Sequence, residues 1–245
     1  MRGLLEGEVH VCRLNLASTP DDLAGQCWPL LDGEEQGRAK RIRHWETRRN
    51  FAMVRSALRF LLGRYLSRDP RSIQFVQGEK GKPRLAGTEP DRGLVFNVSH
   101  SGECGLIALA RDTALGADVE RWRDMANQEG IAERCFSVGE LAYWRALPLE
   151  RKQQAFFSLW CFKEAFAKAT GEGITLGLES CIVDLSAQPR LVSIPNQCGS
   201  PDAWRLVGII AGKGHSGGIC YRGDERKLHL VDDEELVNSL FSFSN

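Results

Sequence analysis

The chain has 245 residues, of which 42% are hydrophobic and 26% charged, values typical of a globular protein with a substantial core. Lys and Arg together equal Asp and Glu in number, so the formal net charge of zero excludes a uniformly basic binder of polyanions. The eight cysteines form no CxxC pair, which argues against a zinc site and favours reduced, buried thiols.

The first half of the chain carries patterns of both strands and helices. Its N-terminus lacks the features of a secretion signal, and no apolar run is long enough to cross a bilayer, so we expect a cytoplasmic protein. Alternation predicts an opening strand over 8–16, and apolar residues at helical spacing predict one long helix over 34–67. The segments that follow are a short strand at 72–77, a loop at 78–93, two strands within 94–112 and a strand at 114–121.

The second half repeats this order loosely. A helical region over 129–147 precedes a long helix over 150–170. Two units of helices followed by strands predict an α+β fold of two similar subdomains, 1–121 and 122–245, with a cleft between them. The strands expected in the second unit lie at 180–185, 203–210 and 214–223, with a further one at 227–231.

The strand at 114–121 contains the sequence GADVE. In a strand, Asp118 and Glu120 point to the same face, and two adjacent carboxylates repel each other unless a cation lies between them. Oxygen ligands of this kind suit Mg²⁺, which takes one or two carboxylates and completes its shell with water and phosphate. The alternative is an edge strand with a solvated acidic face. Gly116 would permit a close backbone approach.

The helix over 150–170 carries charged residues within an apolar sequence. Trp160, Glu164 and Lys168 lie on one helical face in the segment LWCFKEAFAKATGEG. Glu164 and Lys168 are either a solvated surface pair at spacing i, i+4, or functional groups that face a ligand.

The segment from residue 38 to residue 71 is strongly basic and contains only Glu46 and Asp69 as acids. A local excess of positive charge suits a phosphate ligand, whereas a solvated helix face or a nucleic-acid surface are the alternatives. The positive residues surround the predicted helix and do not form one stripe, which argues against nucleic acid. They are Arg38, Lys40, Arg41, Arg43, Arg48, Arg49, Arg55, Arg59, Arg64, Arg68 and Arg71.

Two polar segments precede GADVE. Lys80 and Lys82 lie in the glycine-rich sequence GEKGKPR, where ammonium groups and backbone amides could hold a phosphate. Ser99 and His100 lie in NVSHSG, between two apolar strands, where a histidine is either structural or directed at a ligand. The sequence contains no Walker loop. Acids, cations and a histidine together suit phosphoryl transfer with Mg²⁺.

These motifs resemble those of a known family. GADVE at 116–120, followed by WCFKEAFAK at 160–168, is similar to the paired signature of 4′-phosphopantetheinyl transferases of the Sfp type. GKPRL, FNVSHSG and IAERCFSVGE accompany it in the family's order, so that the resemblance covers about residues 38–173. It implies two similar α+β subdomains related by a pseudo-twofold axis, with the active site in the cleft between them. Ala117 departs from the larger aliphatic residue usual in the family.

The resemblance also implies an activity and a set of site residues. The activity is transfer of the phosphopantetheine arm of coenzyme A to a serine of an apo acyl or peptidyl carrier protein, with release of adenosine 3′,5′-bisphosphate. Asp118, Glu120 and Glu164 would hold Mg²⁺, or Mn²⁺ in its place. The residues expected to bind coenzyme A are Arg38, Lys80, Lys82, Asn97, Ser99, His100 and Lys168.

Charge counting adds a hypothesis about catalysis. Three carboxylates and a pyrophosphate give one Mg²⁺ an excess of negative charge, so one acid could serve partly as a base. We expect Glu164 to take the proton of the carrier serine, directly or through a metal-bound water, with Lys168 steadying the charge. We also expect a protein that acts as a monomer and binds neither nucleic acid nor membrane. The alternatives are a Mg²⁺-dependent nuclease or other phosphohydrolase, and a non-catalytic module that binds carrier proteins or nucleic acid. The sequence leaves the carrier's pathway open among fatty-acid, polyketide and nonribosomal-peptide synthesis.

Overall fold

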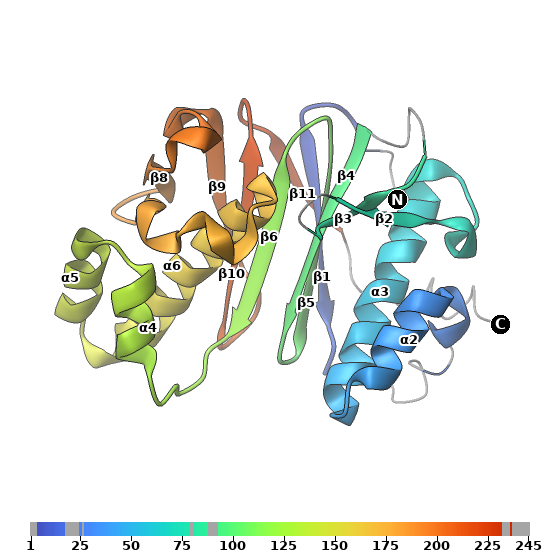
Figure 1. Ribbon diagram of the computed structural model, residues 1–245, viewed down its shortest axis with the longest axis horizontal. Helices are drawn as coiled ribbons and strands as arrows, with labels where there is room; N and C mark the ends of the chain where they lie inside the picture. Colours follow the sequence, from blue (N-terminus) through green and yellow to red (C-terminus); the bar gives the residue numbers. More distant parts are fainter. Residues whose placement is uncertain are drawn as a thin grey trace.

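The computed structural model describes residues 4–17, 25, 27–78, 81–87, 93–231 and 236. Figure 1 shows two halves side by side, each with a long helix against one face of a small sheet, and the two sheets adjacent in the middle. Mixed helices and strands in two such units confirm the predicted α+β class.

The first sheet has the order β11-β1-β5-β4. Strand β1 (Glu8–Asn15) lies antiparallel to β5 (Cys104–Arg111), which lies antiparallel to β4 (Leu94–Ser101). The late strand β11 (Lys227–Val231) pairs parallel to β1. Helix α3 (Trp45–Leu66) packs against this sheet through a buried cluster that includes its own Leu58 and Leu61.

The second sheet has the order β6-β10-β9, with both pairs antiparallel. Its strands are β6 (Leu115–Arg121), β9 (Trp204–Ile209) and β10 (His215–Arg222), and helix α6 (Leu149–Thr170) lies against it. Strand β6 ends at Arg121 and pairs with β10, which follows that residue, whereas β11, which also follows it, pairs with β1 of the first sheet. The subdomain boundary after residue 121 therefore stays a prediction from the order of elements.

A separate apolar cluster lies between the two sheets. It includes Val9 and Ala108 of the first sheet and Ala117, Val119 and Ile219 of the second, and all five are almost fully buried. At about 25 cal/mol per Å² of apolar surface removed from water, such a contact joins the two halves firmly. It also places the outer strand of the first sheet, β4, beside β6, where Asn97 Oδ1 accepts a hydrogen bond of 2.9 Å from the backbone N–H of Ala117.

The remaining helices and strands are short. The helices are α2 (Gly33–Arg41), α4 (Gln128–Cys135) and α5 (Val138–Ala146). The strands are β2 (Phe75–Gln77), β3 (Pro83–Leu85), β7 (Ile182–Asp184) and β8 (Arg190–Ser193). Single 3₁₀ turns lie at Trp28–Leu30, Pro70–Ser72, Gly173–Leu176, Leu178–Ser180, Asn196–Cys198 and Pro201–Ala203.

The single helix predicted over 34–67 is wrong, because the chain breaks between α2 and α3 at residues 42–44. The break lets α2 turn back against α3, where Glu35 accepts hydrogen bonds from Arg55 Nε and Arg59 Nε. Arg59 is fully buried, also contacts Asp32, and donates to the Ile73 carbonyl at 2.7 Å. This ion network requires two helices, and no glycine or proline stands at the break to mark it in the sequence.

The cysteines and the helix lengths bear on two further predictions. All eight cysteines are free thiols and seven are buried, as predicted. Among the helices of the described residues, none combines the length and the apolar character needed to span a bilayer.

Candidate active site

Helix α6 lies directly on the backbone of β6 at Gly116. A Cβ atom on Gly116 would lie 1.9 Å from the carbonyl oxygen of Ala165 and 2.5 Å from the amide nitrogen of Ala169, far inside van der Waals contact. Since those two atoms belong to helix backbone and cannot swing away, only glycine fits here. The close approach brings Glu164 and Lys168 to the face of β6 that carries Asp118.

Asp118 is the buried centre of this region, with 4% of its surface exposed. Its Oδ1 accepts hydrogen bonds from Lys168 Nζ at 2.6 Å and from Ser99 Oγ at 2.9 Å. Its Oδ2 is buried and has no hydrogen-bond partner among the described residues. Burial raises the pKa of Asp118 above its ordinary value, although Lys168 and Ser99 oppose that shift.

Glu164 presents a second buried oxygen without a partner. Its Oε1 has no hydrogen bond within the described part of the chain, and the side chain as a whole is half-buried. Burial raises the pKa of Glu164, and the nearby negative charges of Asp118 and Glu120 raise it further. A carboxylate with a raised pKa is a stronger base than one in water.

Glu120 lies at the more open end of the same strand. Its Oε2 accepts hydrogen bonds from Ser101 Oγ at 2.7 Å and from the Arg123 guanidinium at 2.9 Å. Arg123 is half exposed, so this ion pair is held only weakly. Glu120 can therefore turn toward a cation on the α6 side without a large cost.

The donor set fits a hard divalent cation. It consists of three carboxylates, and two of them hold buried oxygens with no hydrogen-bond partner among the described residues. Lys168 supplies positive charge beside Asp118 in the same place. Within the part of the chain that the structure describes, no three His, Cys, Asp or Glu side chains are already gathered closely enough to hold a metal ion.

Of the two lysines of GEKGKPR that are predicted to bind coenzyme A, the structure describes Lys82. Lys80 lies outside the described residues. Lys82 extends toward the second half, where its Nζ donates to the carbonyl oxygens of Leu115 and Lys168, both at 2.7 Å. Burial lowers the pKa of Lys82 to about 8.

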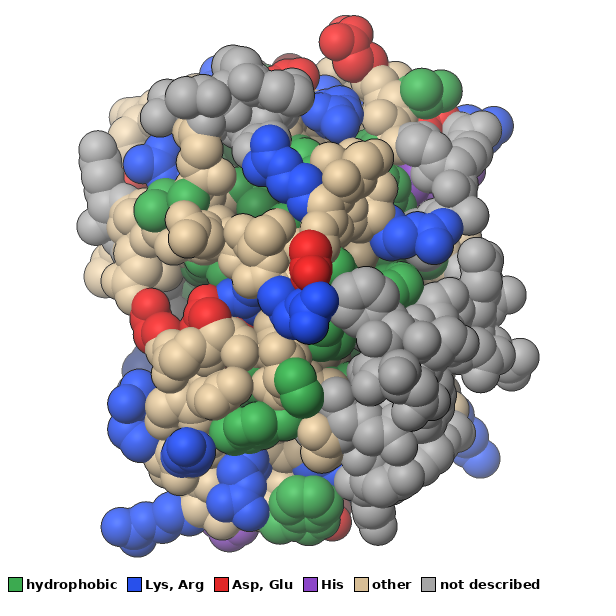
Figure 2. Space-filling view, turned by 90° about the vertical axis from the view of Figure 1, so that its right-hand side faces the viewer, with side chains coloured by type: hydrophobic (Ala, Val, Ile, Leu, Met, Phe, Trp, Pro, Cys, Tyr) green, Lys and Arg blue, Asp and Glu red, His purple; other side chains and the backbone are tan. Residues whose placement is uncertain are grey.

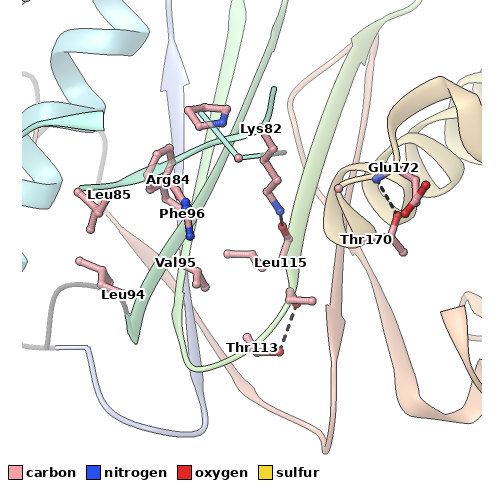
Figure 3. Close-up of a pocket in the computed structure, with 14 residues that line it drawn as sticks. Lys82, Arg84, Leu85, Leu94, Val95, Phe96, Thr113, Leu115, Thr170 and Glu172 are labelled. Carbon is pink, nitrogen blue, oxygen red and sulfur yellow. Dashed lines mark hydrogen bonds between the residues drawn. The ribbon is translucent and has the colours of Figure 1, made fainter. Parts of the chain in front are cut away.

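Figure 3 shows Lys82 reaching across a cavity toward the backbone of Leu115. The cavity has a volume of about 460 Å³ and lies between the two halves. Its walls come from β3, β4, the start of β6 and the residues that follow α6, including Arg84, Leu85, Val95, Thr113 and Glu172.

Arg38 and His100 line a second, smaller cavity in the first half. It has a volume of about 210 Å³ and is also lined by Arg55, Phe51 and Phe96. The Arg38 guanidinium lies over the Phe51 ring at 5.2 Å from its centroid. Two arginines, a histidine and aromatic rings suit an aromatic ligand that carries a phosphate.

The basic residues of α2 and α3 otherwise do not form one surface. Figure 2 shows Lys and Arg side chains of this side of the molecule standing apart, with other surface between them. Arg59 is buried in its ion network, and Arg55 is held by Glu35. The prediction that about half of these arginines form an ordinary solvated helix face stays a prediction.

Three residues that lie at this candidate site are not among those predicted to bind coenzyme A or the metal. Arg55 belonged to the basic run, but only the break between α2 and α3 brings it to the cavity with Arg38. Ser101 follows His100 in NVSHSG and donates to Glu120. Its hydroxyl lies in the same polar segment as that of Ser99, so the same sequence pattern indicates both residues. The thiol of Cys161, one turn before Glu164, donates to the Ser216 carbonyl, and burial with the nearby Asp118 raises its pKa well above the ordinary value.

A buried ion pair fixes α6 from its other side. Lys163 is fully buried and its Nζ lies 2.8 Å from Glu140 Oε2. The same ammonium donates to the carbonyl oxygens of Leu178 and Cys181 at 2.9 and 2.5 Å. Glu140 in turn accepts from the Val183 amide and caps the start of α5. Lys163 therefore sets the rotation of α6 that directs the next residue, Glu164, toward β6.

Comparison with known proteins identifies the class to which this site belongs. The family model of the 4′-phosphopantetheinyl transferase superfamily matches residues 114–220, from the start of β6 into β10. The chain is 35% identical over 207 residues to the 4′-phosphopantetheinyl transferase HetI of Nostoc sp., covering 84% of each protein. It is 32% identical over 163 residues to psf-1 of Bacillus pumilus, covering 66% of each protein, and that relative is also named a 4′-phosphopantetheinyl transferase.

A third relative with that name, ffp of Bacillus subtilis, is 29% identical over 168 residues, covering 68% of this chain and 72% of the relative. The chain therefore belongs to the 4′-phosphopantetheinyl transferase superfamily, as its motifs predicted. It is a transferase of this type, and the family uses coenzyme A as substrate and acts on carrier proteins.

Proposed function

We propose that this enzyme transfers the phosphopantetheine arm of coenzyme A to a serine hydroxyl of an apo carrier protein, in a reaction that requires Mg²⁺. The observation that carries the metal requirement is the pair of buried oxygens, Asp118 Oδ2 and Glu164 Oε1, that have no hydrogen-bond partner in the described chain. A buried carboxylate oxygen without a partner costs free energy unless a ligand satisfies it.

Asp118, Glu120 and Glu164 would hold the cation, with Mn²⁺ able to replace Mg²⁺ because both prefer oxygen ligands. When bound, the metal neutralises the charge of the pyrophosphate and of the leaving bisphosphate. Lys168 Nζ donates to Asp118 Oδ1 at 2.6 Å, to Ser99 Oγ at 3.1 Å and to the Ala117 carbonyl at 3.2 Å, so it would hold a phosphate oxygen beside the acids by giving up one of the two longer bonds.

The other end of coenzyme A would enter the small cavity of the first half. Its 3′-phosphate suits Arg38, Arg55 and His100, and its aromatic base suits the rings of Phe51 and Phe96. Lys80 and the backbone of the loop that contains Lys82 stay candidates from the resemblance for contact with this nucleotide. Asn97 contributes by its bond to the Ala117 amide, which holds β4 against the start of the acidic motif.

In the transfer step, the serine oxygen of the carrier attacks the phosphorus that bears the pantetheine arm. The bond from that phosphorus to the bridging oxygen breaks, and adenosine 3′,5′-bisphosphate leaves with the electron pair. Glu164 takes the serine proton, and Lys168 stabilises charge on the transferred phosphoryl group.

The test is intact mass spectrometry of an apo acyl or peptidyl carrier protein incubated with the enzyme, coenzyme A and Mg²⁺. We expect a mass gain of one phosphopantetheine arm, lost on adding EDTA and reduced on the order of 10²–10⁴-fold in rate by Glu164→Gln. The matched control is Glu150→Gln, which changes an exposed carboxylate at the start of the same helix, far from the acid cluster. Full turnover of Glu164→Gln would remove Glu164 from the role of base, and undiminished transfer in EDTA would refute the metal.

A second experiment concerns His100. Burial lowers the pKa of His100, and the positive charges of Lys168 and Arg38 lower it further. Because the folded-state pKa lies below the unfolded-state value, His100 favours the folded state above pH 6.5, and this contribution is lost as the pH falls through the folded-state pKa. NMR titration of His100 should show this low pKa, and adenosine 3′,5′-bisphosphate should raise it. An unchanged pKa with the nucleotide bound would exclude His100 as a phosphate contact.

The structure also supports proposals about the oligomeric state, the ligand and the cellular compartment. One chain supplies β4, β6 and α6 to the site, so we propose that it acts as a monomer. The separation of the Lys and Arg side chains on the face in Figure 2 favours coenzyme A over nucleic acid as the polyanionic ligand. The eight free thiols fit a reducing compartment such as the cytoplasm.

A further inference from the structure

We propose that the Lys82 side chain acts as a positioning residue, a clamp between the halves that holds the end of α6 so that Lys168 faces Asp118. This inference rests on the proposed function for its kinetic consequences. Lys82 Nζ donates to the carbonyl oxygens of Leu115 and Lys168, which lie 33 and 86 residues away along the chain. A single ammonium thus joins the loop before β3, the first residue of β6 and the last turn of α6.

The Lys168 carbonyl is one that needs an outside partner. It belongs to the last four residues of α6, whose carbonyls have no amide further along the helix to accept from. Gly171 caps the helix with a φ of +77°, and its amide approaches the same oxygen at 3.3 Å. Lys82 adds a shorter, charged hydrogen bond of 2.7 Å, and a cation at a helix C-terminus is favoured by the helix dipole.

The clamp and the acid cluster meet in one residue. Lys168 is held at its backbone by Lys82, and at its side chain it donates to Asp118, Ser99 and the Ala117 carbonyl. The backbone of α6 is also pressed onto β6 at Gly116, one residue after the Leu115 carbonyl that Lys82 binds. Lys82 therefore ties together the two segments whose spacing decides where Lys168 Nζ lies.

The alternative role, direct binding of a phosphate by the Lys82 ammonium, is limited by these contacts. An ammonium has three N–H groups, and two are used by carbonyls at 2.7 Å. The third N–H could reach one phosphate oxygen, whereas a contact through two N–H groups would require Lys82 to leave a carbonyl. Backbone amides of the same loop could still contact the nucleotide while the side chain stays in place.

The experiment compares Lys82→Met and Lys82→Arg with the wild type, and uses Arg84→Met as the matched control. Arg84 is a neighbouring cation that lines the same cavity, and Lys82 is the one of the two that bonds the backbone of α6. Lys82→Met keeps most of the aliphatic stem and removes the donors, whereas Lys82→Arg keeps a charged donor. Each variant is measured for the Kd of coenzyme A by calorimetry, for kcat on an apo carrier protein, and for amide hydrogen exchange in α6.

We expect Lys82→Met to lower kcat by about tenfold or more, to change the Kd of coenzyme A by less than about threefold, and to speed exchange at the last turn of α6. Lys82→Arg should recover part of kcat. Lys82→Met combined with Lys168→Met should be no slower than Lys168→Met alone, because both changes act through one group. Arg84→Met should resemble the wild type in all three measurements.

Other outcomes would overturn the clamp. A Kd weakened about tenfold or more with unchanged kcat would make Lys82 a phosphate ligand. Effects of the two substitutions that multiply, or exchange in α6 that does not change, would show that Lys82 does not act through Lys168. Failure of the wild type to modify any carrier would count against the proposed function, whereas the exchange measurement would still decide the clamp. If Lys82→Met does not fold, Lys82→Gln carries the same comparison, because its shorter, neutral amide cannot span both carbonyls.

Discussion

Replacing Asp118 by asparagine is expected to lower kcat/KM on an apo carrier protein by about 10³-fold, equivalent to about 4 kcal/mol of transition-state stabilisation. The substituted side chain would keep the shape of the aspartate and one oxygen that accepts from Lys168 and Ser99. It would lack the negative charge beside the proposed cation and would place an amide nitrogen where the buried Oδ2 now lies. The loss should therefore fall on metal-dependent binding and turnover, and the fold should persist.

The measurement is steady-state kinetics across a series of Mg²⁺ concentrations, together with thermal unfolding. Asp124→Asn is the matched control, since Asp124 is an exposed acid just beyond the same strand and accepts a hydrogen bond of 3.3 Å from Gln153. The control should retain wild-type kinetics. An Asp118→Asn enzyme with unchanged kcat/KM and the same Mg²⁺ dependence would refute a ligand role for Asp118.

Replacing Lys163 by methionine is expected to lower the free energy of unfolding by about 3–5 kcal/mol, because it leaves Glu140 buried without its partner. The ammonium satisfies three oxygens at once, those of Glu140, Leu178 and Cys181. Methionine has nearly the same length but no donor, so those oxygens lose a hydrogen bond each. Burial lowers the pKa of Lys163 and the charge of Glu140 raises it, so the buried ammonium depends on this carboxylate.

Urea denaturation measures this change, with Arg151→Met as the control on the exposed part of the same helix. The control should alter the free energy of unfolding by less than about 0.5 kcal/mol. Adding Glu140→Gln to Lys163→Met should recover part of the loss, since it removes the uncompensated charge. A Lys163→Met protein as stable as the wild type would show that the pair does not hold α6.

These predictions concern two faces of one helix. Asp118 lies against the side of α6 where chemistry is proposed, and Lys163 belongs to the opposite side, where the helix is fixed in the second half. Adjacent residues 163 and 164 therefore have different tasks. A change at Lys163 should lower activity only as far as it displaces Glu164, whereas a change at Asp118 should leave the helix in place.

Local patterns in the sequence were sufficient to predict most strands and the acidic motif. Alternation located β1, and apolar runs bounded by turns located β4, β5 and β6. The period of two placed Asp118 and Glu120 on one face, because successive side chains of a strand point to opposite sides. Helical spacing located α6 and placed Glu164 with Lys168. Such features depend on neighbours within a few residues, and the sequence alone contains those neighbours.

The way these elements are used became visible only in three dimensions. The break between α2 and α3 follows from the ion pair of Arg59 with Glu35, two residues that lie 24 positions apart in the sequence. The contacts of Lys82 with Lys168 and of Lys163 with Cys181 join segments that no periodic pattern relates. Each depends on which buried donor meets which acceptor after the halves have packed together. The sequence therefore identified the candidate reacting groups, whereas long-range packing established the supports that hold them in register.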